Sequence, residues 1–507
     1  MVRPFSRSPG YESSLRTFWF TVLLLLSCIS AFGRAVAMES QSTLIPAGAA
    51  RIDISPIEAV PLMGYAARAQ LPAPTIVVQR IHARALALGA DPGAAVLLTV
   101  DNCILPGAIT AEIRARLARR LGLPAERIAI LVTHTHSAPC LTGAAPNIFA
   151  RDIAPDDQAR IDAYTRFFTD RLEAVAVEAL SQRRPSRIAW GQGAVGFAKN
   201  RRTAGGPVDH SLPLLRVSDP DGTVRAVFVS YACHCTTLGG DLNAVHGDWA
   251  GVAAQSLEAG GTNGVALVGI GCGADSNPDP RGTLDLVNRH GMSLADEARR
   301  LLALPLTELT QAPTCRLTTL PLPFQPHFTR AEWEQRATNS GIIGHHARKW
   351  LARLDRGETL PPTLPYPVQT WSFGDQLAMV FLGGEVVVDY SLRLKRELRA
   401  DRLWINAYAN DVPCYIPSRR ILSEGGYEAE SSLWYYDRPQ RLSPAIEDQI
   451  IDEVRDLLPR SYRTDPREAE FPPPKSPDEA LQAFRAVEGL SSASQRWFGL
   501  YDVAAAH

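Results

Sequence analysis

Between Ala50 and about Leu458, short apolar segments alternate along the chain with segments whose apolar residues recur at helical spacing. This alternation is typical of α/β proteins, in which a mixed β-sheet core is flanked by helices. The expected strands are Ala83–Leu88, Ala95–Val100, Ile128–Val132, Arg225–Ala232, Val265–Ile270, Leu377–Leu382 and Leu403–Tyr408. The expected helices are Thr110–Leu121, Asp162–Leu180, Trp249–Leu257, Asp285–Leu302, Val386–Leu398 and Ala445–Leu457. We therefore predict one large α/β domain over residues 38–462.

The composition is that of an ordinary globular protein, because 46% of the 507 residues are hydrophobic and 21% are charged. Such a chain can bury a large core. The formal net charge of -1 provides no basic excess for a polyanion, so we expect no nucleic-acid partner. The composition leaves the oligomeric state open.

The first residues of the chain predict export. Arginines precede an apolar run from Phe18 to Phe32, and the small residues Ala35-Val36-Ala37 follow it. The run is short for a membrane span. We therefore predict a secretory signal over residues 1–37, cleaved near Ala37, and a secreted or periplasmic protein. Lipid attachment at Cys28 is the alternative, although Leu26 fits such a site badly.

The last segment, residues 463–507, differs in character from the rest of the chain. Prolines and charges accumulate between Thr464 and Pro477, with Pro472-Pro473-Pro474 at the centre, which is typical of a linker. Ser476 then precedes Pro477 at the expected start of a helix. We predict a proline-rich linker followed by a short helical tail.

Potential ligand side chains follow four of the expected strands. They are His134 and His136 after Ile128–Val132, His234 after Arg225–Ala232, Glu385 after Leu377–Leu382, and Asp411 and Tyr415 after Leu403–Tyr408. A fifth strand ends in the loop Gly271-Cys-Gly-Ala-Asp-Ser-Asn-Pro. Because ligands bind beyond the carboxyl ends of the strands in α/β sheets, we expect a metal site where these loops converge.

The residue types in these loops suit zinc. Two imidazoles and a carboxylate are a donor set that Zn²⁺ binds, with one position open for water. In the loop Thr133–Ser137, one histidine can bind the metal while the other donates a proton or polarises a carbonyl. Each residue alone also has a plainer explanation. A single histidine is commonly hydrogen-bonded in a core, and Glu385 is an acid typical of a helix N-terminus.

Taken together, these residues resemble the neutral/alkaline non-lysosomal ceramidase family, in its N-terminal catalytic domain. The resemblance extends from Arg51 to about Leu458. The motifs that carry it are Arg51-Ile-Asp-Ile-Ser-Pro, Arg80-Ile-His-Ala-Arg-Ala-Leu-Ala-Leu, Thr133-His-Thr-His-Ser-Ala-Pro, Asn200-Arg201, Tyr231-Ala-Cys-His, His246-Gly-Asp, Gly273-Ala-Asp-Ser-Asn-Pro, Gly384-Glu385 and Gly426-Tyr427-Glu428. Most are short, and their common order makes the resemblance specific.

Neutral ceramidases hydrolyse the amide of an N-acyl sphingoid base with a single zinc ion. The resemblance therefore implies one Zn²⁺ per chain, a small-molecule or lipid-like N-acyl substrate, and attack of zinc-bound water on the amide carbonyl. It leaves open contact with a membrane surface. The implied metal ligands are His134, His234, Glu385 and Tyr415. The implied catalytic residues are His136 beside the scissile carbonyl, Arg201 lining the site, Asn277 at the position of a family serine, and Tyr427 at the oxyanion.

The sequence departs from the family pattern in three places. Asn277 stands where ceramidases have the serine of Gly-Asp-x-Ser-Pro, and Ser276 is displaced from that position by one residue. The loop Ala409–Ser418 is less hydroxylated and more rigid than its counterpart in the family. We also expect no C-terminal immunoglobulin-like domain. The fold and the zinc site tolerate these departures better than the ceramide substrate does.

The sequence thus predicts an exported zinc-dependent amidohydrolase that resembles neutral ceramidase. One alternative is a zinc esterase or phosphoesterase, because zinc hydroxide is not restricted to amides. The other is a non-catalytic ceramidase-like binding protein. Asn277 favours it, whereas the two histidines of the Thr133–Ser137 loop, Glu385 and Tyr427 oppose it.

Overall fold

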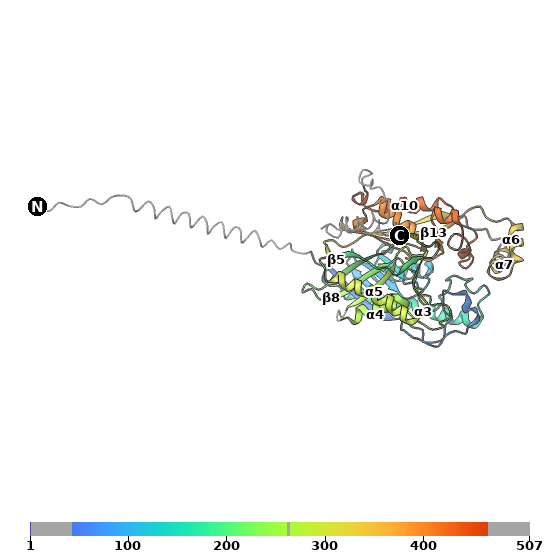
Figure 1. Ribbon diagram of the computed structural model, residues 1–507, viewed down its shortest axis with the longest axis horizontal. Helices are drawn as coiled ribbons and strands as arrows, with labels where there is room; N and C mark the ends of the chain where they lie inside the picture. The colour runs from blue at the N-terminus through green and yellow to red at the C-terminus, as the bar shows by residue number, and fades with distance from the viewer. Residues whose placement is uncertain (2–42, 261–263, 465–507) are drawn as a thin grey trace. The chain divides into compact units, whose positions relative to one another are not determined.

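The computed structural model describes residues 43–260 and 264–464, together with Met1 (Figure 1). Apart from Met1, the predicted signal over residues 1–37, with Cys28, lies outside the described residues, as does the predicted helix after Ser476. Within the described part, no helix is both long and apolar enough to cross a membrane. The strands and helices belong to one structural unit, which begins at Leu44.

The largest element of that unit is a nine-stranded mixed sheet. Its order is β4-β3-β2-β1-β5-β7-β8-β9, and β11 pairs with β5. The strands are β1 (Ile45–Asp53), β2 (His82–Leu88), β3 (Ala95–Val100), β4 (Ile128–Val132), β5 (Arg184–Ala194), β7 (Ser211–Ser218), β8 (Val224–Tyr231), β9 (Val265–Ile270) and β11 (Thr307–Leu309). Two pairs, β3–β4 and β8–β9, are parallel, and a helix connects the strands of each.

A four-stranded sheet packs against one face of the large sheet. Its order is β12-β13-β14-β16. The strands are β12 (Thr314–Pro323), β13 (Thr363–Phe373), β14 (Leu377–Leu382) and β16 (Leu403–Asn406). Apolar side chains from both sheets form one core, in which Trp404 stacks on Phe228 with ring centroids 4.5 Å apart. The two sheets therefore lie face to face.

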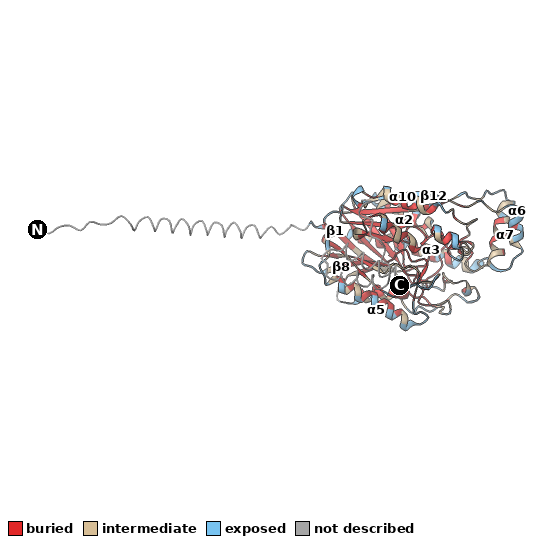
Figure 2. Ribbon diagram, turned by 45° about the horizontal axis from the view of Figure 1, so that its top comes forward, coloured by how far each residue is buried: buried red, intermediate tan, exposed pale blue. Residues whose placement is uncertain are grey.

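Helices cover the outer faces of both sheets. They are α2 (Gly107–Leu121), α3 (Pro155–Ser181), α4 (Asp248–Ala259), α5 (Leu284–Leu302), α8 (Val388–Glu397) and α10 (Ile446–Leu457). Helices α3, α4 and α5 pack on the large sheet, and α10 packs on the small one, on the opposite side of the unit (Figure 1). Figure 2 shows buried strands between these helices, whose outer surfaces are exposed. The order of layers is helix, sheet, sheet, helix.

A separate helical pair lies at one end of the unit (Figures 1 and 2). It consists of α6 (Arg330–Ala337) and α7 (Gly341–Asp355), which enclose an apolar cluster around Trp333 and Trp350. A capping box begins α6, because Thr329 and Glu332 each accept the backbone N–H of the other.

The predicted strands and helices all appear, and their bounds agree within three residues except at α3, which begins at Pro155 and not at the expected Asp162. The predicted helix over 386–398 begins at Val388, because β15 (Glu385–Val386) pairs first with β17 (Tyr415–Ile416). Strands β1, β5, β7, β12 and β13 were not predicted. Prolines and glycines interrupt several of them, which weakens the strand pattern. The sequence also did not predict that the strands divide between two sheets.

A short segment joins the two edge strands of the large sheet. Gly269 of β9 lies against Leu131 of β4, although these strands stand at opposite ends of the sheet order. The segment 407–410, which follows β16, bonds to both: Ala407 N–H donates to Ile270 O, and Asn410 N–H donates to Ile130 O. The loops after β4, β8 and β9 are thereby brought to the same place.

A buried ion pair links the large sheet to α8. The Lys395 ammonium donates to Asp209 at 2.6 Å and to Ser211 at 2.7 Å, and Ser391 also donates to Asp209. Burial alone would raise the pKa of Asp209, but Lys395 together with the hydrogen bonds of Ser211 and Ser391 outweighs burial and lowers it to about 2. The charged carboxylate is thus the form that the fold stabilises.

We expect Asp209→Asn to lower the free energy of unfolding by about 3–5 kcal/mol at neutral pH, because it removes the carboxylate charge that the buried Lys395 ammonium contacts. The folded pKa of Asp209 lies below its ordinary value of 3.8, so this stabilisation is present above that value. It is lost as pH falls through about 4 toward 2. Urea unfolding of wild type and variant across that range measures the difference. A difference that persists at the acid end would contradict the assignment.

Candidate metal centre

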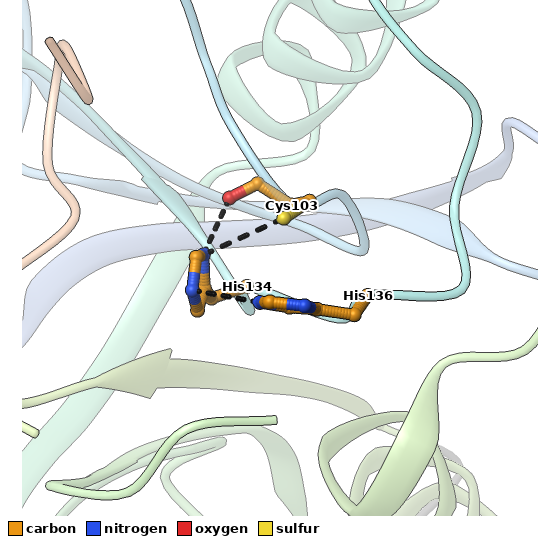
Figure 3. Close-up of side chains that lie close together, drawn as sticks. All are labelled: Cys103, His134 and His136. Atoms are coloured by element: carbon orange, nitrogen blue, oxygen red, sulfur yellow. Dashed lines mark hydrogen bonds between the residues drawn. The ribbon is translucent and has the colours of Figure 1, made fainter. Parts of the chain in front are cut away.

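His134 follows β4 in a backbone conformation that fixes its ring. The residue has φ 56°, in the left-handed region, and the preceding Thr133 N–H is bonded to Val100 O at 2.9 Å. The His134 Nδ1 lies 2.7 Å from Cys103 O, so this nitrogen carries the proton and donates it (Figure 3). The buried ring therefore presents Nε2 as an acceptor on its other side.

His234 is held in the same way after β8. Its Nδ1 lies 2.9 Å from Gly273 O, and its backbone N–H donates to Ser276 O. Position 273 has no room for a side chain, because a Cβ there would lie 2.5 Å from Cys233 N. The glycine lets the chain pass close enough for its carbonyl to orient the His234 ring. The Nε2 of His234 is again left as an acceptor.

Glu385 supplies the third buried acceptor. It follows Gly384, whose φ of 78° ends β14 in a turn that suits glycine. Glu385 Oε2 lies 3.1 Å from His134 Nε2 and 3.2 Å from His234 Nε2. These three atoms form a candidate metal-binding group, and Oε2 has no hydrogen-bond partner among the described residues.

The spacing of these three atoms fits a four-coordinate cation. Ligands about 2.0–2.1 Å from a tetrahedral ion stand about 3.3–3.4 Å from one another. Without a positive charge between them, the three acceptors would repel, so either a proton or a metal ion is required. With protons alone, burial lowers the pKa of His134, but Glu385 and Cys103 together outweigh burial and raise it to about 10. Burial and the Arg201 cation lower the pKa of His234 to about 4.

Tyr415, Arg201 and Tyr427 adjoin this group. Tyr415 OH lies 3.2 Å from His234 Nε2 and accepts a hydrogen bond of 3.1 Å from Arg201. The Arg201 guanidinium lies 5.6 Å from the ring centroids of both tyrosines and forms a 2.8 Å ion pair with Glu428. Tyr427 is 43% exposed, whereas Tyr415 is buried. The tyrosine pair therefore extends from the metal-binding group to the surface.

His136 stands on the other side of the group. Its Nε2 lies 3.1 Å from His134 Nε2, and its half-buried ring packs against Tyr65 with centroids 4.9 Å apart. Arg68 donates to the His136 carbonyl oxygen. A Cβ on Gly64 would lie 2.5 Å from the His136 ring. The segment around residues 64–68 thus sets the orientation of this imidazole.

Asn277 follows Ser276, whose carbonyl oxygen accepts the His234 backbone N–H. It lies on β10 (Ser276–Pro278), which pairs with β6 (Ala198–Asn200). Among the described residues no hydrogen bond joins it to the metal-binding group, and its Oδ1 is buried without a partner. Ser276 Oγ, on the opposite side of the strand, is also buried without a partner in that part of the chain. Asp411, a further candidate from the sequence, accepts from Gly107 N–H instead.

Cys103, His134 and His136 form a second group of close ligand atoms (Figure 3). The Cys103 sulfur faces His134 Nδ1 at 3.8 Å, whereas His136 faces His134 Nε2. A single ion cannot use opposite nitrogens of one ring together with both neighbours. Burial raises the pKa of the nearby Cys140 thiol, in keeping with inert packing cysteines in this region. Cys103 contributes its backbone carbonyl oxygen, which accepts the His134 Nδ1 proton and so orients the ring.

Two residues that contact the metal-binding group of His134, His234 and Glu385 were not predicted from the sequence. Tyr408 packs on His134 with ring centroids 4.5 Å apart, and Tyr436 donates a hydrogen bond from its hydroxyl to Glu385 Oε1. Neither residue has a metal-ligand pattern around it. The sequence around Tyr435 and Tyr436 also has no strand or helix pattern that would predict a functional site. Only the fold shows their proximity.

The match to known proteins agrees with the resemblance. Residues 46–268 match the family model described as neutral/alkaline non-lysosomal ceramidase, N-terminal. The predicted resemblance is confirmed. We therefore call the described part the ceramidase-like domain. Its predicted bounds of 38–462 stay a prediction.

Two solved structures share the fold of the ceramidase-like domain. One is a ceramidase complexed with C2, with a TM-score of 0.64, 16% sequence identity and coverage of 83% of this chain and 77% of that chain. The other is neutral ceramidase from Pseudomonas aeruginosa, with a TM-score of 0.63, 18% identity and coverage of 83% and 76%. At these identities the likeness shows the fold. No curated protein sequence matches the chain.

We expect a divalent cation to stabilise the domain, because it relieves the repulsion between three buried acceptors. At a free concentration of 100 times its Kd, the ion adds about 2.7 kcal/mol to the free energy of unfolding. Thermal or urea unfolding of chelated protein, titrated with metal, measures this. Glu385→Ala should abolish the dependence, whereas Glu334→Ala, on the surface of α6, should keep it. Metal dependence that survives Glu385→Ala would place the ion elsewhere.

Proposed function

We propose that this protein is a zinc-dependent amidohydrolase that cleaves the amide of an N-acyl, lipid-like substrate. The proposal rests on the convergence of three buried acceptors, with Glu385 Oε2 at 3.1 Å from His134 Nε2 and at 3.2 Å from His234 Nε2. Nitrogen and carboxylate donors at tetrahedral spacing favour zinc over the hard cations, which prefer oxygen ligands at higher coordination number. The ceramidase family match supports an amide as the bond that is cleaved.

In this proposal His134, His234 and Glu385 hold the ion, and Tyr415 completes the set from beside His234. Bound zinc supplies a Lewis acid and lowers the pKa of water toward 7. The carbonyl oxygens of Cys103 and Gly273 keep both imidazoles in the tautomer that can bind metal.

His136 is the proposed proton-transfer group. Its ring adjoins the ligands without competing for Glu385, and burial with the neighbouring His134 keeps its pKa well below the ordinary value. A neutral imidazole can accept a proton from the attacking water and pass it to the leaving amine. Arg201 and Tyr427 provide donors on the opposite side, where the Tyr427 hydroxyl is the proposed partner of the oxyanion. Asn277 stays a candidate for substrate contact.

We also propose that the protein acts after export, on the basis of the leader-like residues 1–37. An N-acyl lipid would then be met at or near a membrane surface. N-terminal sequencing of the mature protein, with cleavage near Ala37 expected, tests this part independently of the chemistry.

Metal analysis of protein purified without chelator should find about one zinc per chain. Incubation with N-acyl amides, including a labelled ceramide, should release the free fatty acid and amine, and His134→Ala should abolish both zinc and turnover. Faster cleavage of matched esters or phosphoesters would select the esterase alternative. Zinc-loaded wild type that is inert across this panel would instead support the binding protein.

We expect Gly64→Ala to lower turnover about 100-fold while zinc content is unchanged, since a displacement of about 1 Å at a reacting group has that effect. The new Cβ would collide with the His136 ring, 2.5 Å away, and its three nearest atoms all belong to His136. Gly143→Ala is the matched control, because Gly143 also has a positive φ, of 83°, but has no heavy atom within 4 Å of the added Cβ. Equal losses in the two variants would mean that backbone strain, and not His136, is responsible.

A further inference from the structure

Tyr436 contacts the one ligand whose binding mode is variable. Its hydroxyl donates to Glu385 Oε1, while Glu385 Oε2 faces the two histidines. The ring is 6% exposed and lies 6.3 Å from the ring of Tyr415. The two oxygens of Glu385 are therefore already divided between a hydrogen bond and the metal-binding group.

The turn that carries Tyr436 is fixed from outside the metal centre. Asn147 donates from its backbone to Tyr435 O at 3.1 Å and from its side chain to Trp434 O at 2.9 Å. Arg353 of α7 forms an ion pair with Asp437, which follows Tyr436 and has a left-handed φ of 57°. Helix α7 therefore helps to fix the position of the Tyr436 hydroxyl that donates to Glu385.

This division of the carboxylate matters for coordination. A glutamate binds a cation through one oxygen or through both. With His134, His234, Tyr415 and one oxygen of Glu385 as ligands, water would take the fifth position of an expanded site. A Glu385 bound through both oxygens would occupy that position instead. A hydrogen bond to Oε1 opposes that rotation of the carboxylate.

We propose that Tyr436 is a positioning residue that holds Glu385 as a one-oxygen ligand and so keeps one coordination position free. This inference rests on the metal centre of the proposed function. Tyr436 thereby sets the coordination number of the bound ion. Helix α7 influences it through the ion pair with Asp437. Tyr436 itself neither binds the metal nor meets the substrate.

The test is Tyr436→Phe, which removes the hydroxyl and keeps the ring. We expect the Kd for zinc to rise about 10–100-fold, as for other residues that orient a ligand. The visible absorption of the Co²⁺-substituted protein should weaken, since a second carboxylate oxygen raises the coordination number. Turnover per bound metal should fall with little change in KM. Tyr435→Phe, one residue earlier, should match wild type in all three measurements.

Arg353→Gln gives an independent variant that leaves the hydroxyl in place and loosens its turn. It should shift zinc affinity and the Co²⁺ spectrum in the same direction by a smaller amount. If wild type binds zinc and cobalt and Tyr436→Phe matches it in either affinity or spectrum, the role of Tyr436 is overturned. If wild type binds neither ion, the proposed metal centre itself is wrong.

Discussion

The backbone hydrogen bonds of residues 407–410 hold the candidate metal centre together. This segment donates to β9 through Ala407 and to β4 through Asn410, so it closes the gap between strands that the sheet order places at opposite edges. His134 follows one of these strands, and Gly273, which orients His234, follows the other. Because backbone bonds do not depend on side-chain identity, the position of both histidines is set by the fold before any ligand binds.

Side-chain orientation adds a second level of constraint. Each histidine of the metal-binding group donates its Nδ1 proton to a backbone carbonyl, and Glu385 accepts from Tyr436 through one oxygen only. The remaining acceptor atoms point at one another, which is unfavourable in a buried environment unless a cation lies between them. Removing these acceptor atoms from water therefore costs free energy at this one site. That cost is the physical reason to expect a cation there.

The sequence predicted the elements and the ligand types better than it predicted their surroundings. His134, His136, His234 and Glu385 could be found because each follows an apolar segment with a clear strand pattern, and structural convergence at strand ends is a general property of such sheets. Tyr436 could not be found this way, since it reaches Glu385 across 51 residues from an irregular turn. The division into two sheets was hidden for a similar reason. Strands such as β5 and β13 carry glycine or proline, and their pairing depends on contacts distant in sequence.

Left-handed backbone conformations cluster around the metal centre, at His134, Tyr408 and Asn410, none of which is glycine. Each such residue costs about 1–2 kcal/mol relative to the right-handed region. The surrounding hydrogen bonds must compensate for this conformational cost when the chain folds. Ligand binding therefore does not have to supply the free energy for these conformations. The centre is therefore preorganised: its conformational cost belongs to folding stability. Variants in which these three residues adopt ordinary backbone conformations should be more stable to unfolding. Their site would then have to change conformation each time a ligand binds.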